Sequence, residues 1–433
     1  MSEIPSDQPF SVSESDTLIL RIRHDAVPPL GGFGRLIGPR EILVSIDDAE
    51  PLLTASDEAG FVDGVFNNST IYFPLVPELL GAAVVDNEDN WGFGIDGLDA
   101  AAFKKRGAEG DSVRIGIADS GMDATHPMFA KLLSEDRLVA FAHFDKLGKK
   151  VVQTNADGSV IADADAKPTY GHWHGTHCAG ILVGEATDGM AHGLAPQAQL
   201  AVTRVLELAN EGSVAGVLAG LWWLTEQKCD VVSISLGMPG FHEEWWPPIE
   251  ALLKAGTVVV AAVGNEALTP GSALSRSPAN YLPTDNQEQG RLIAVGAHDQ
   301  AGAVWDESSG EKVDWSGVQI DQPGGTSRPS VFASSPPRII PALVAPGVDI
   351  ISASPNGLYR SSAGSSMATP HLAALIALVL SELRARQKDT SPNVAADLIV
   401  SCLKDVPPAG EDTRSGKGRV DNALLAEKLT AID

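Results

Sequence analysis

Cysteine, aromatic residues and positive charge are all scarce in this sequence of 433 residues. The three cysteines, Cys178, Cys229 and Cys402, are odd in number and widely spaced, which argues for reduced thiols and against a disulfide framework. Lys and Arg number 31 against 56 Asp and Glu, so the formal net charge is −25. A chain this acidic is not expected to bind nucleic acid or anionic lipid.

Signals for membrane insertion and secretion are also missing. We expect no stretch to be long and apolar enough to span a membrane. The first residues, Met1 to Asp7, are polar and acidic, and they lack the basic and apolar regions of a signal peptide. Together with reduced thiols, this start favours a cytoplasmic location. The alternative is a protein secreted without a recognisable signal peptide.

The remaining composition is typical of a globular α/β protein. Apolar residues make up 44% of the chain and charged residues 20%. Strand-like apolar runs alternate with apolar segments that follow His174 and Ser366 and read as helices. This alternation predicts an α/β fold with a doubly wound, mostly parallel sheet and helices on both faces. Residues 1–90 are expected to form an N-terminal extension, and residues 91–433 the main domain.

A serine follows a glycine at the predicted start of a buried helix. Ser366 lies in the segment Gly364–His371, directly ahead of the apolar run Leu372–Leu380. The start of a helix directs unpaired N–H groups, with partial positive charge, at the place where an oxyanion would form. Such a hydroxyl suits a nucleophile, although Ser is also a common residue at ordinary helix starts.

Two upstream motifs supply a carboxylate and a histidine. Asp119 ends the strand-like run Val113–Asp119, and in α/β sheets ligand crevices open at the ends of such strands. An Asp before Ser-Gly also starts ordinary turns. His174 lies at the entry to a predicted buried helix, with His177 three residues further on. A zinc pair is one interpretation of these histidines, but the sequence shows neither a His-Glu-x-x-His pattern nor an evident further ligand.

The chain order of Asp119, His174 and Ser366 resembles that of the subtilisin family of serine peptidases, the subtilases. The resemblance covers roughly Trp91 to the C-terminus. Further segments resemble landmarks of that family: Gly193–Pro196, Ser233–Gly237, Val258–Glu266, Val344–Gly347 and Gly416–Val420. Cys178, close after the histidine, resembles the proteinase K branch, where a free cysteine lies beneath the catalytic histidine. A buried small apolar side chain is the plainer interpretation of Cys178.

The resemblance implies a serine endopeptidase that hydrolyses protein or peptide substrates through an acyl-enzyme intermediate. It assigns the nucleophile to Ser366, the general base to His174, and the carboxylate that orients the imidazole to Asp119. Asn265 would donate its side-chain N–H to the oxyanion, with a capping or turn role as the alternative. The rival function is a catalytically silent member of the family that serves as a binding or regulatory protein.

Two backbone segments are assigned to substrate binding on the same resemblance. One would offer an extended edge to the peptide, and the other would form the opposite wall of the pocket for the residue before the scissile bond, the P1 residue. These residues are Ser235, Leu236 and Gly237, and Ala262, Val263 and Gly264. The pocket floor is expected near Ala279 or Asn280. No charged residue is expected there, so an uncharged, apolar P1 residue is predicted.

No cofactor is expected for the chemistry, and no metal ligand is assigned. Subtilases commonly bind structural calcium, and the loop from Glu185 to Ala191 has a suitable length. However, Met128 stands where many members place an acidic ligand, and a thioether is a poor ligand for a hard cation. This residue argues against the strongest calcium site of the family.

Subtilases also commonly carry an N-terminal segment that inhibits the enzyme or assists its folding. Residues 1–90 are a candidate for such an autoinhibitory or chaperone-like segment, with the apolar strip Tyr72–Pro77 lying across the active site. A surface β-arm packed on the main domain is the alternative. Two insertions, at about 132–169 and 301–341, are expected to be surface loops near the substrate cleft.

Overall fold

The computed structural model describes residues 17–23, 34–59, 62–72, 90–185, 193–207, 211–283, 290–321, 326–386, 388 and 391–432. Beyond Tyr72, the apolar strip predicted to cross the active site lies outside the described residues. The same holds for residues 186–191 of the loop considered for calcium.

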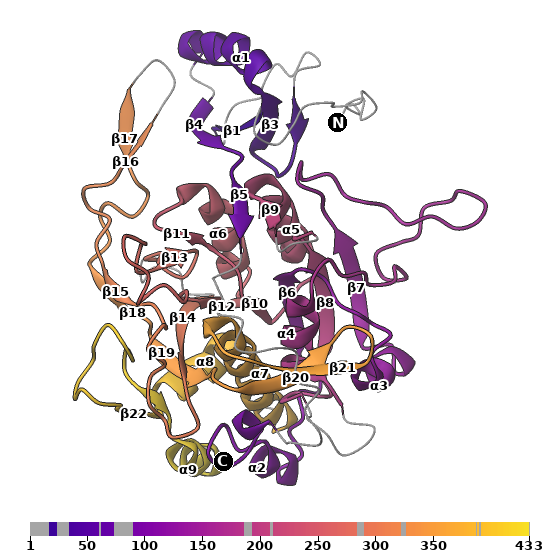
Figure 1. Ribbon diagram of the computed structural model, residues 1–433, viewed down its shortest axis with the longest axis vertical. Helices are drawn as coiled ribbons and strands as arrows, with labels where there is room; N and C mark the ends of the chain where they lie inside the picture. Colours follow the sequence, from indigo (N-terminus) through magenta and orange to yellow (C-terminus); the bar gives the residue numbers. More distant parts are fainter. Residues whose placement is uncertain are drawn as a thin grey trace.

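A nine-stranded sheet forms the centre of the molecule (Figure 1). Every neighbouring pair in it is parallel except the pair β22–β23 at one edge. In spatial order the strands are β22 (Leu403–Lys404), β23 (Arg419–Val420), β19 (Leu343–Pro346), β14 (Arg291–His298), β12 (Val258–Ala262), β10 (Val231–Ile234), β6 (Arg114–Asp119), β8 (Gln199–Arg204) and β7 (Leu138–His143). The predicted α/β fold with a mostly parallel sheet is confirmed.

Two apolar cores cover the two faces of this sheet. Successive side chains of a strand point to opposite faces, so Val258 and Val260 join one core while Val259 and Ala261 join the other. The first core contains α4 (Trp173–Val183), α7 (Ser365–Ala385) and α8 (Pro392–Val400). The second contains α5 (Val214–Glu226) and α6 (Trp246–Lys254). The strands therefore read as continuous apolar runs because both of their faces are buried.

The central helix α7 contradicts the expectation that no stretch is apolar and long enough to cross a membrane. Among the described residues, it passes that test by length and composition. Its apolar window is entirely buried inside the protein. A helix that is apolar on all sides is equally suited to the core of a large protein, and α7 contacts β6, β10, β12, β14 and β19 in that position.

The N-terminal extension contains a small sheet with its own core. Its strands β1 (Thr17–Ile22), β2 (Arg35–Leu36), β3 (Glu41–Ser45) and β4 (Val62–Asn67) lie in the order β2-β3-β1-β4 and pair in antiparallel fashion. The helix α1 (Ile46–Ala59) contributes Ala49 and Leu52 to the core of this unit. From the opposite face of the sheet, Ile19 and Leu43 join the core around α5 and α6.

The two predicted insertions contain more structure than surface loops. The first contains β7, an edge strand of the central sheet, because residues 138–143 are apolar enough to be buried there. The second forms the hairpin β16 (Gln319–Asp321) and β17 (Ser327–Pro329), together with the pair β15 (Glu311–Val313) and β18 (Arg338–Ile340). Its strand β16 contacts β4 of the extension (Figure 1).

Candidate active site

Asp119 and His174 lie side by side at the carboxyl end of the sheet. Asp119 is the last residue of β6, and His174 lies in the first turn of α4. The Nδ1 atom of His174 is 2.9 Å from Oδ1 and 3.0 Å from Oδ2 of Asp119. Both side chains are almost fully buried. A buried carboxylate in this position fixes the orientation and tautomer of the imidazole.

A glycine allows α4 to approach the loop after β6 closely enough for this contact. A Cβ atom on Gly175 would lie 2.1 Å from the carbonyl oxygen of Gly121 and 3.0 Å from Oδ1 of Asp119. Any larger residue at this position would therefore push the helix, and with it His174, away from the carboxylate. The N–H of Gly175 also donates to the hydroxyl of Ser120 at 3.0 Å.

Ser366 occupies the first turn of α7 and is buried. Its hydroxyl donates to the carbonyl oxygen of Ser235 at 3.2 Å. Gly364, two residues before Ser366, has a φ of +151°, and a Cβ atom there would lie 3.0 Å from Nδ2 of Asn265. The glycine is thus required both by the backbone turn and by the close approach of Asn265.

A proline four residues after Ser366 leaves the carbonyl oxygen of Ser366 without its usual helical donor, so that two neighbouring side chains can bind it. Pro370 lies inside α7 and has no N–H to donate to the carbonyl oxygen of Ser366. That oxygen instead accepts from the hydroxyl of Ser235 at 2.9 Å and from the thiol of Cys178 at 3.6 Å. These bonds connect the start of α7 to the end of β10 and to α4, which places the three segments of the site in one rigid arrangement.

Asn265 follows β12 and faces the start of α7. Its Oδ1 accepts hydrogen bonds from the N–H and the hydroxyl of Ser365, both at 2.9 Å. Its Nδ2 is buried and finds no hydrogen-bond partner among the described residues. A buried donor left without a partner costs about 1–3 kcal/mol. This atom is therefore positioned to donate to a ligand at the start of α7.

The two predicted substrate-binding segments lie at the ends of neighbouring parallel strands. Residues 235–237 follow β10, and residues 262–264 end and follow β12. Both segments contact the start of α7, through the hydroxyl of Ser235 and the N–H of Gly264. Arg276 and Glu266, which the sequence analysis did not single out, form a buried ion pair beside these segments, and Arg276 also donates to the carbonyl oxygen of Gly237. Asn280, suggested for the pocket floor, is buried, and its Nδ2 donates to the carbonyl oxygen of Gly240 and the hydroxyl of Ser275.

His177 and His174 do not form the zinc pair considered from the sequence, because their rings bind different partners. Its Nε2 lies 3.1 Å from the carbonyl oxygen of Ile350 and 3.0 Å from that of Arg360. Burial lowers the pKa of His177 to about 3, so the ring is neutral. It is a core histidine that connects α4 to the strands β20 (Ile350–Ser354) and β21 (Leu358–Ser362).

By distance alone, a metal ion fits Asp119, His174 and Cys178, whose ligand atoms all lie within 4.8 Å of one another. The contact between Asp119 and His174 already uses these atoms. Burial, followed by the charge of Asp119, raises the pKa of the Cys178 thiol well above its usual value. The thiol is therefore protonated, and a protonated thiol is a poor metal ligand.

The described residues around the loop considered for calcium do not fit that ion. The side chain of Met128 is buried, and its Cε atom fills the space beside Gly184. The carboxylate of Glu185 forms ion pairs with Lys131 and Arg137. A thioether and a carboxylate already neutralised by two cations do not make a site for a hard cation.

Comparison with known proteins agrees with the family resemblance that the sequence motifs indicated. A profile of the subtilase family matches residues 110–418. Subtilisin amylosacchariticus of Bacillus subtilis subsp. amylosacchariticus is 28% identical over 293 residues, which are 67% of this chain and 61% of that protein. The match thus spans less than two thirds of that relative.

Two further relatives are covered over more of their length. The major intracellular serine protease of Bacillus subtilis (strain 168) is 29% identical over 309 residues, or 71% of this chain and 81% of that protein. Subtilisin DY of Bacillus licheniformis is 27% identical over 337 residues, or 77% of this chain and 98% of that protein. Because the family profile spans most of the main domain and the fold agrees, the chain belongs to the subtilase family.

Proposed function

We propose that this protein is a serine endopeptidase that hydrolyses peptide bonds through an Asp119–His174–Ser366 triad. The observation that carries the proposal is the contact of Asp119 and His174 beside the start of α7, where Sγ of Cys178 lies 3.8 Å from Nδ1 of His174 and 3.6 Å from the carbonyl oxygen of Ser366. Asp119 holds the His174 ring at 2.9 Å, Ser366 begins α7, and the unpartnered Nδ2 of Asn265 faces the same helix start. Family membership and the names of the relatives support the same chemistry.

In the proposed mechanism, the Ser366 hydroxyl attacks the carbonyl carbon of the scissile bond while Nε2 of His174 takes its proton. Asp119 stabilises the imidazolium that results. The negative charge on the substrate oxygen is stabilised by Nδ2 of Asn265 and by the N–H of Ser366 at the positive end of α7. His174 then protonates the leaving amine, which departs and leaves Ser366 acylated. A water molecule, deprotonated by His174, attacks the acyl carbon, and Ser366 leaves with the proton that His174 returns.

Hydrolysis of a fluorescently labelled, denatured protein tests this proposal directly. The wild type should release peptides, and His174→Ala should lose almost all of that activity while unfolding at a similar temperature. A folded protein that releases no peptides, either whole or after removal of residues 1–72, would favour the silent, binding role instead. Equal release by the wild type and the variant would contradict the assignment of His174.

We also propose that the protein acts in the cytoplasm. All three cysteines are buried and unbridged, as expected for reduced thiols. Two of the relatives are named as intracellular serine proteases. Fractionation of the source cells, with antibody detection of the chain, tests this proposal.

We further propose that residues 1–90 restrain the peptidase. The strand β5 (Thr70–Tyr72) pairs in antiparallel fashion with β9 (Glu211–Ser213), immediately before α5. This pairing lies beyond β8, whose last residue Arg204 is in register with Asp119. The extension therefore adds a strand at the carboxyl end of the sheet, the end that carries the site. Strand addition is also a way in which proteins bind extended peptides, so β5 could compete with a substrate for this edge.

The extension also caps the helix that follows β9. The N–H groups of Val214 and Ala215 donate to the carbonyl oxygen of Ser69 at 3.1 Å and to the Asn68 side chain at 2.9 Å. The first N–H groups of a helix have no partner within the helix. The first turn of α5 therefore depends on the extension for two of its hydrogen bonds.

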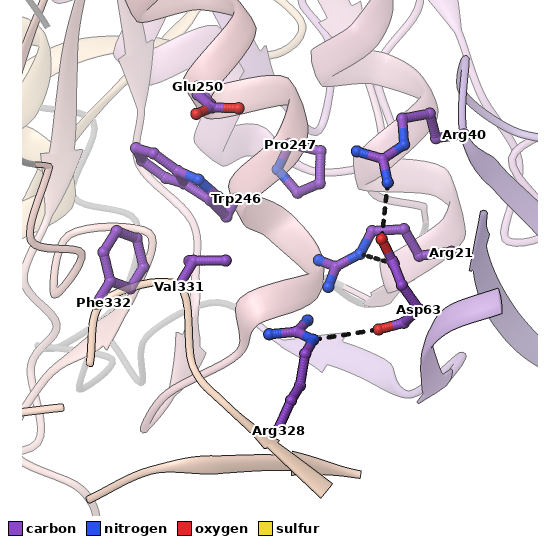
Figure 2. A pocket seen from close by; sticks show the side chains of 9 residues that line it. All are labelled: Arg21, Arg40, Asp63, Trp246, Pro247, Glu250, Arg328, Val331 and Phe332. Atoms are coloured by element: carbon purple, nitrogen blue, oxygen red, sulfur yellow. Dashed lines mark hydrogen bonds and ion pairs between the residues drawn. The ribbon is translucent and has the colours of Figure 1, made fainter. Parts of the chain in front are cut away.

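Charged residues join the extension to the short helix η5 (Glu243–Trp245), directly ahead of α6, and to the second insertion. Figure 2 shows Arg21, Arg40 and Arg328 gathered around Asp63 at this contact. Arg21 pairs with Asp63 within the extension and with Glu243 of the main domain. Glu243 is also paired with Arg328 of the hairpin β16–β17. A cavity of about 450 Å³ lies at this contact. Removing one partner from such a buried network is costly, so we expect the extension to stay attached after a single cut in the chain.

Cleavage between the extension and the main domain should raise activity. The test uses a full-length chain with a specific protease site placed between Tyr72 and Asn90, so that the protein folds before it is cut. Washing the cut protein in mild denaturant to remove residues 1–72 should raise kcat/KM by about 5- to 150-fold, the usual range for coupled binding events. Equal activity of two folded proteins would leave the extension as packing only. Loss of folding would make it a structural element.

Cys178 gives a separate prediction about the triad. Its Sγ lies 3.8 Å from Nδ1 of His174, and we propose that the thiol takes no part in the chemistry. A mercurial that binds it should displace His174, and a misplacement of about 1 Å can cost about 10² in rate. Cys178→Ala should remain active and resist mercury. If mercury inhibits both proteins equally, the modified site is Cys229 or Cys402.

A further inference from the structure

Arg276 and Glu266 form an ion pair between the two substrate-binding segments. Nη2 of Arg276 is 2.5 Å and its Nε 3.0 Å from Oε1 of Glu266, and both side chains are about 5% exposed or less. Nη1 of Arg276 donates to the carbonyl oxygen of Gly237 at 2.5 Å. Arg276 belongs to β13 (Arg276–Ser277), which pairs with β11 (Met238–Pro239) directly after the first segment.

The side chain of Arg276 extends from one wall of the pocket to the other. A Cβ atom on Gly237 would lie 3.1 Å from Cβ of Arg276. On the opposite wall, a Cβ atom on Gly264 would lie 3.2 Å from both Cδ and Nε of Arg276 and 2.3 Å from Oε2 of Glu266. The space beside Gly264 is therefore filled by the arginine stem and the glutamate carboxylate, and the space beside Gly237 by Cβ of Arg276 and the carbonyl oxygen of Ser277.

The pair is held in place by further bonds on the glutamate. Oε2 of Glu266 accepts from the N–H of Asn265 at 2.9 Å and from the hydroxyl of Ser309 at 3.2 Å. Each charged group thus has both a counter-ion and additional hydrogen bonds. Breaking such a buried pair leaves an uncompensated charge. A substrate side chain that needs this space would have to displace the pair.

We propose that Arg276 and Glu266 restrict the P1 pocket to small, uncharged side chains such as those of Gly, Ala and Ser. This inference rests on the proposed peptidase function. Arg276 acts as a specificity-determining residue, since it occupies the volume that a larger P1 side chain would fill. Glu266 holds Arg276 in position. It also accepts from the N–H of Asn265, the residue proposed to stabilise the oxyanion, so a change at Glu266 would affect two functions. Replacing Arg276 is therefore the cleaner change.

Four peptides that differ only at P1, carrying Ala, Phe, Lys or Asp, test the inference. The wild type should cleave the Ala peptide with a kcat/KM at least about tenfold above the other three, since a misfit of a few atoms in a pocket is worth about 10- to 200-fold. A wild type that prefers Phe, Lys or Asp would overturn the inference without any variant.

Two variants separate the effect of pocket volume on P1 preference from the effect of the Glu266 charge. Arg276→Ala leaves the Glu266 carboxylate unpaired in an enlarged pocket, so the ratio of Lys to Ala cleavage should rise by about 10²-fold. Arg276→Ala with Glu266→Gln keeps an acceptor for the N–H of Asn265 but removes the charge. This double variant should gain cleavage after Phe and not after Lys. Unchanged P1 ratios in both folded variants would overturn the inference.

A matched control and an independent active-site assay complete the test. Arg291→Ala removes an arginine from an exposed pair with Asp397 and should leave every P1 ratio unchanged. Labelling by a fluorophosphonate, which carries no P1 side chain, reports whether the nucleophile works in each protein. A folded protein that neither labels nor cleaves, even after residues 1–72 are cut off and washed away, contradicts the peptidase function itself. A labelled wild type with the wrong P1 preference contradicts only the inference.

Discussion

Ser366→Ala is expected to lower kcat by a factor on the order of 10⁶, the loss known for the nucleophile of subtilisin rather than a value derived from this chain. The change removes one buried oxygen atom, whose hydrogen bond goes to the carbonyl oxygen of Ser235 at 3.2 Å. The surrounding bonds at the start of α7, from Ser235 and Cys178, use the backbone of residue 366 and remain possible. The variant should therefore fold like the wild type. Steady-state turnover and thermal unfolding, measured together, check both parts.

Ser381→Ala provides the matched control, because Ser381 is a buried serine of the same helix. It should retain wild-type turnover. If folded Ser366→Ala retains more than about 1% of wild-type turnover, a residual far above that expected without a nucleophile, Ser366 is not the nucleophile.

Asn265→Ala is expected to lower kcat by about 10²–10³, the cost found when subtilisin loses its oxyanion asparagine. The physical reason lies in the buried Nδ2, which has no partner among the described residues and would gain one only as negative charge develops. Because this bond strengthens in the transition state, KM should change little. Initial rates over a range of substrate concentrations separate the two constants.

The same asparagine also positions Ser365, so a second variant is needed. Ser365→Ala removes the hydroxyl that donates to Oδ1 of Asn265 at 2.9 Å and leaves Nδ2 in place. It should cost less than about tenfold, the order of one neutral hydrogen bond. If the two variants lose the same activity, Asn265 acts by packing rather than by donating to the oxyanion.

The site residues could be predicted because each lies in a short local motif. Asp119 ends a strand, His174 begins one helix and Ser366 begins another, so apolar runs next to them reveal their places. A parallel sheet collects the ends of its strands at one edge. Their mutual approach therefore follows from the fold class, and the contact between Asp119 and His174 is the result.

The ion pair of Arg276 and Glu266 could not be predicted in this way. The two residues are separated by a loop of no regular pattern, and they meet only because β13 pairs with β11. An arginine in a loop ordinarily indicates a solvated side chain. The predicted pocket floor, near Ala279 and Asn280, therefore did not include Arg276.

The contacts that attach the extension to the main domain could not be predicted from the sequence either. Asn68 caps a helix 147 residues further along the chain. No local signal near Asn68 indicates that partner, since its side chain suits an ordinary turn as well. The buried charge network of Arg21 and Glu243 likewise joins segments 222 residues apart. Contacts of this kind depend on how the extension packs as a unit, and periodicity along the sequence does not report that.

Covalent labelling by a fluorophosphonate, followed by mapping of the modified peptide, tests the central claim most directly. The cut and washed protein should carry one adduct, on Ser366, and no adduct should form in Ser366→Ala. Labelling of His174→Ala should be slower by several orders of magnitude, because the hydroxyl then has no base. An adduct on another residue, or equal labelling rates with and without His174, would contradict the proposed triad.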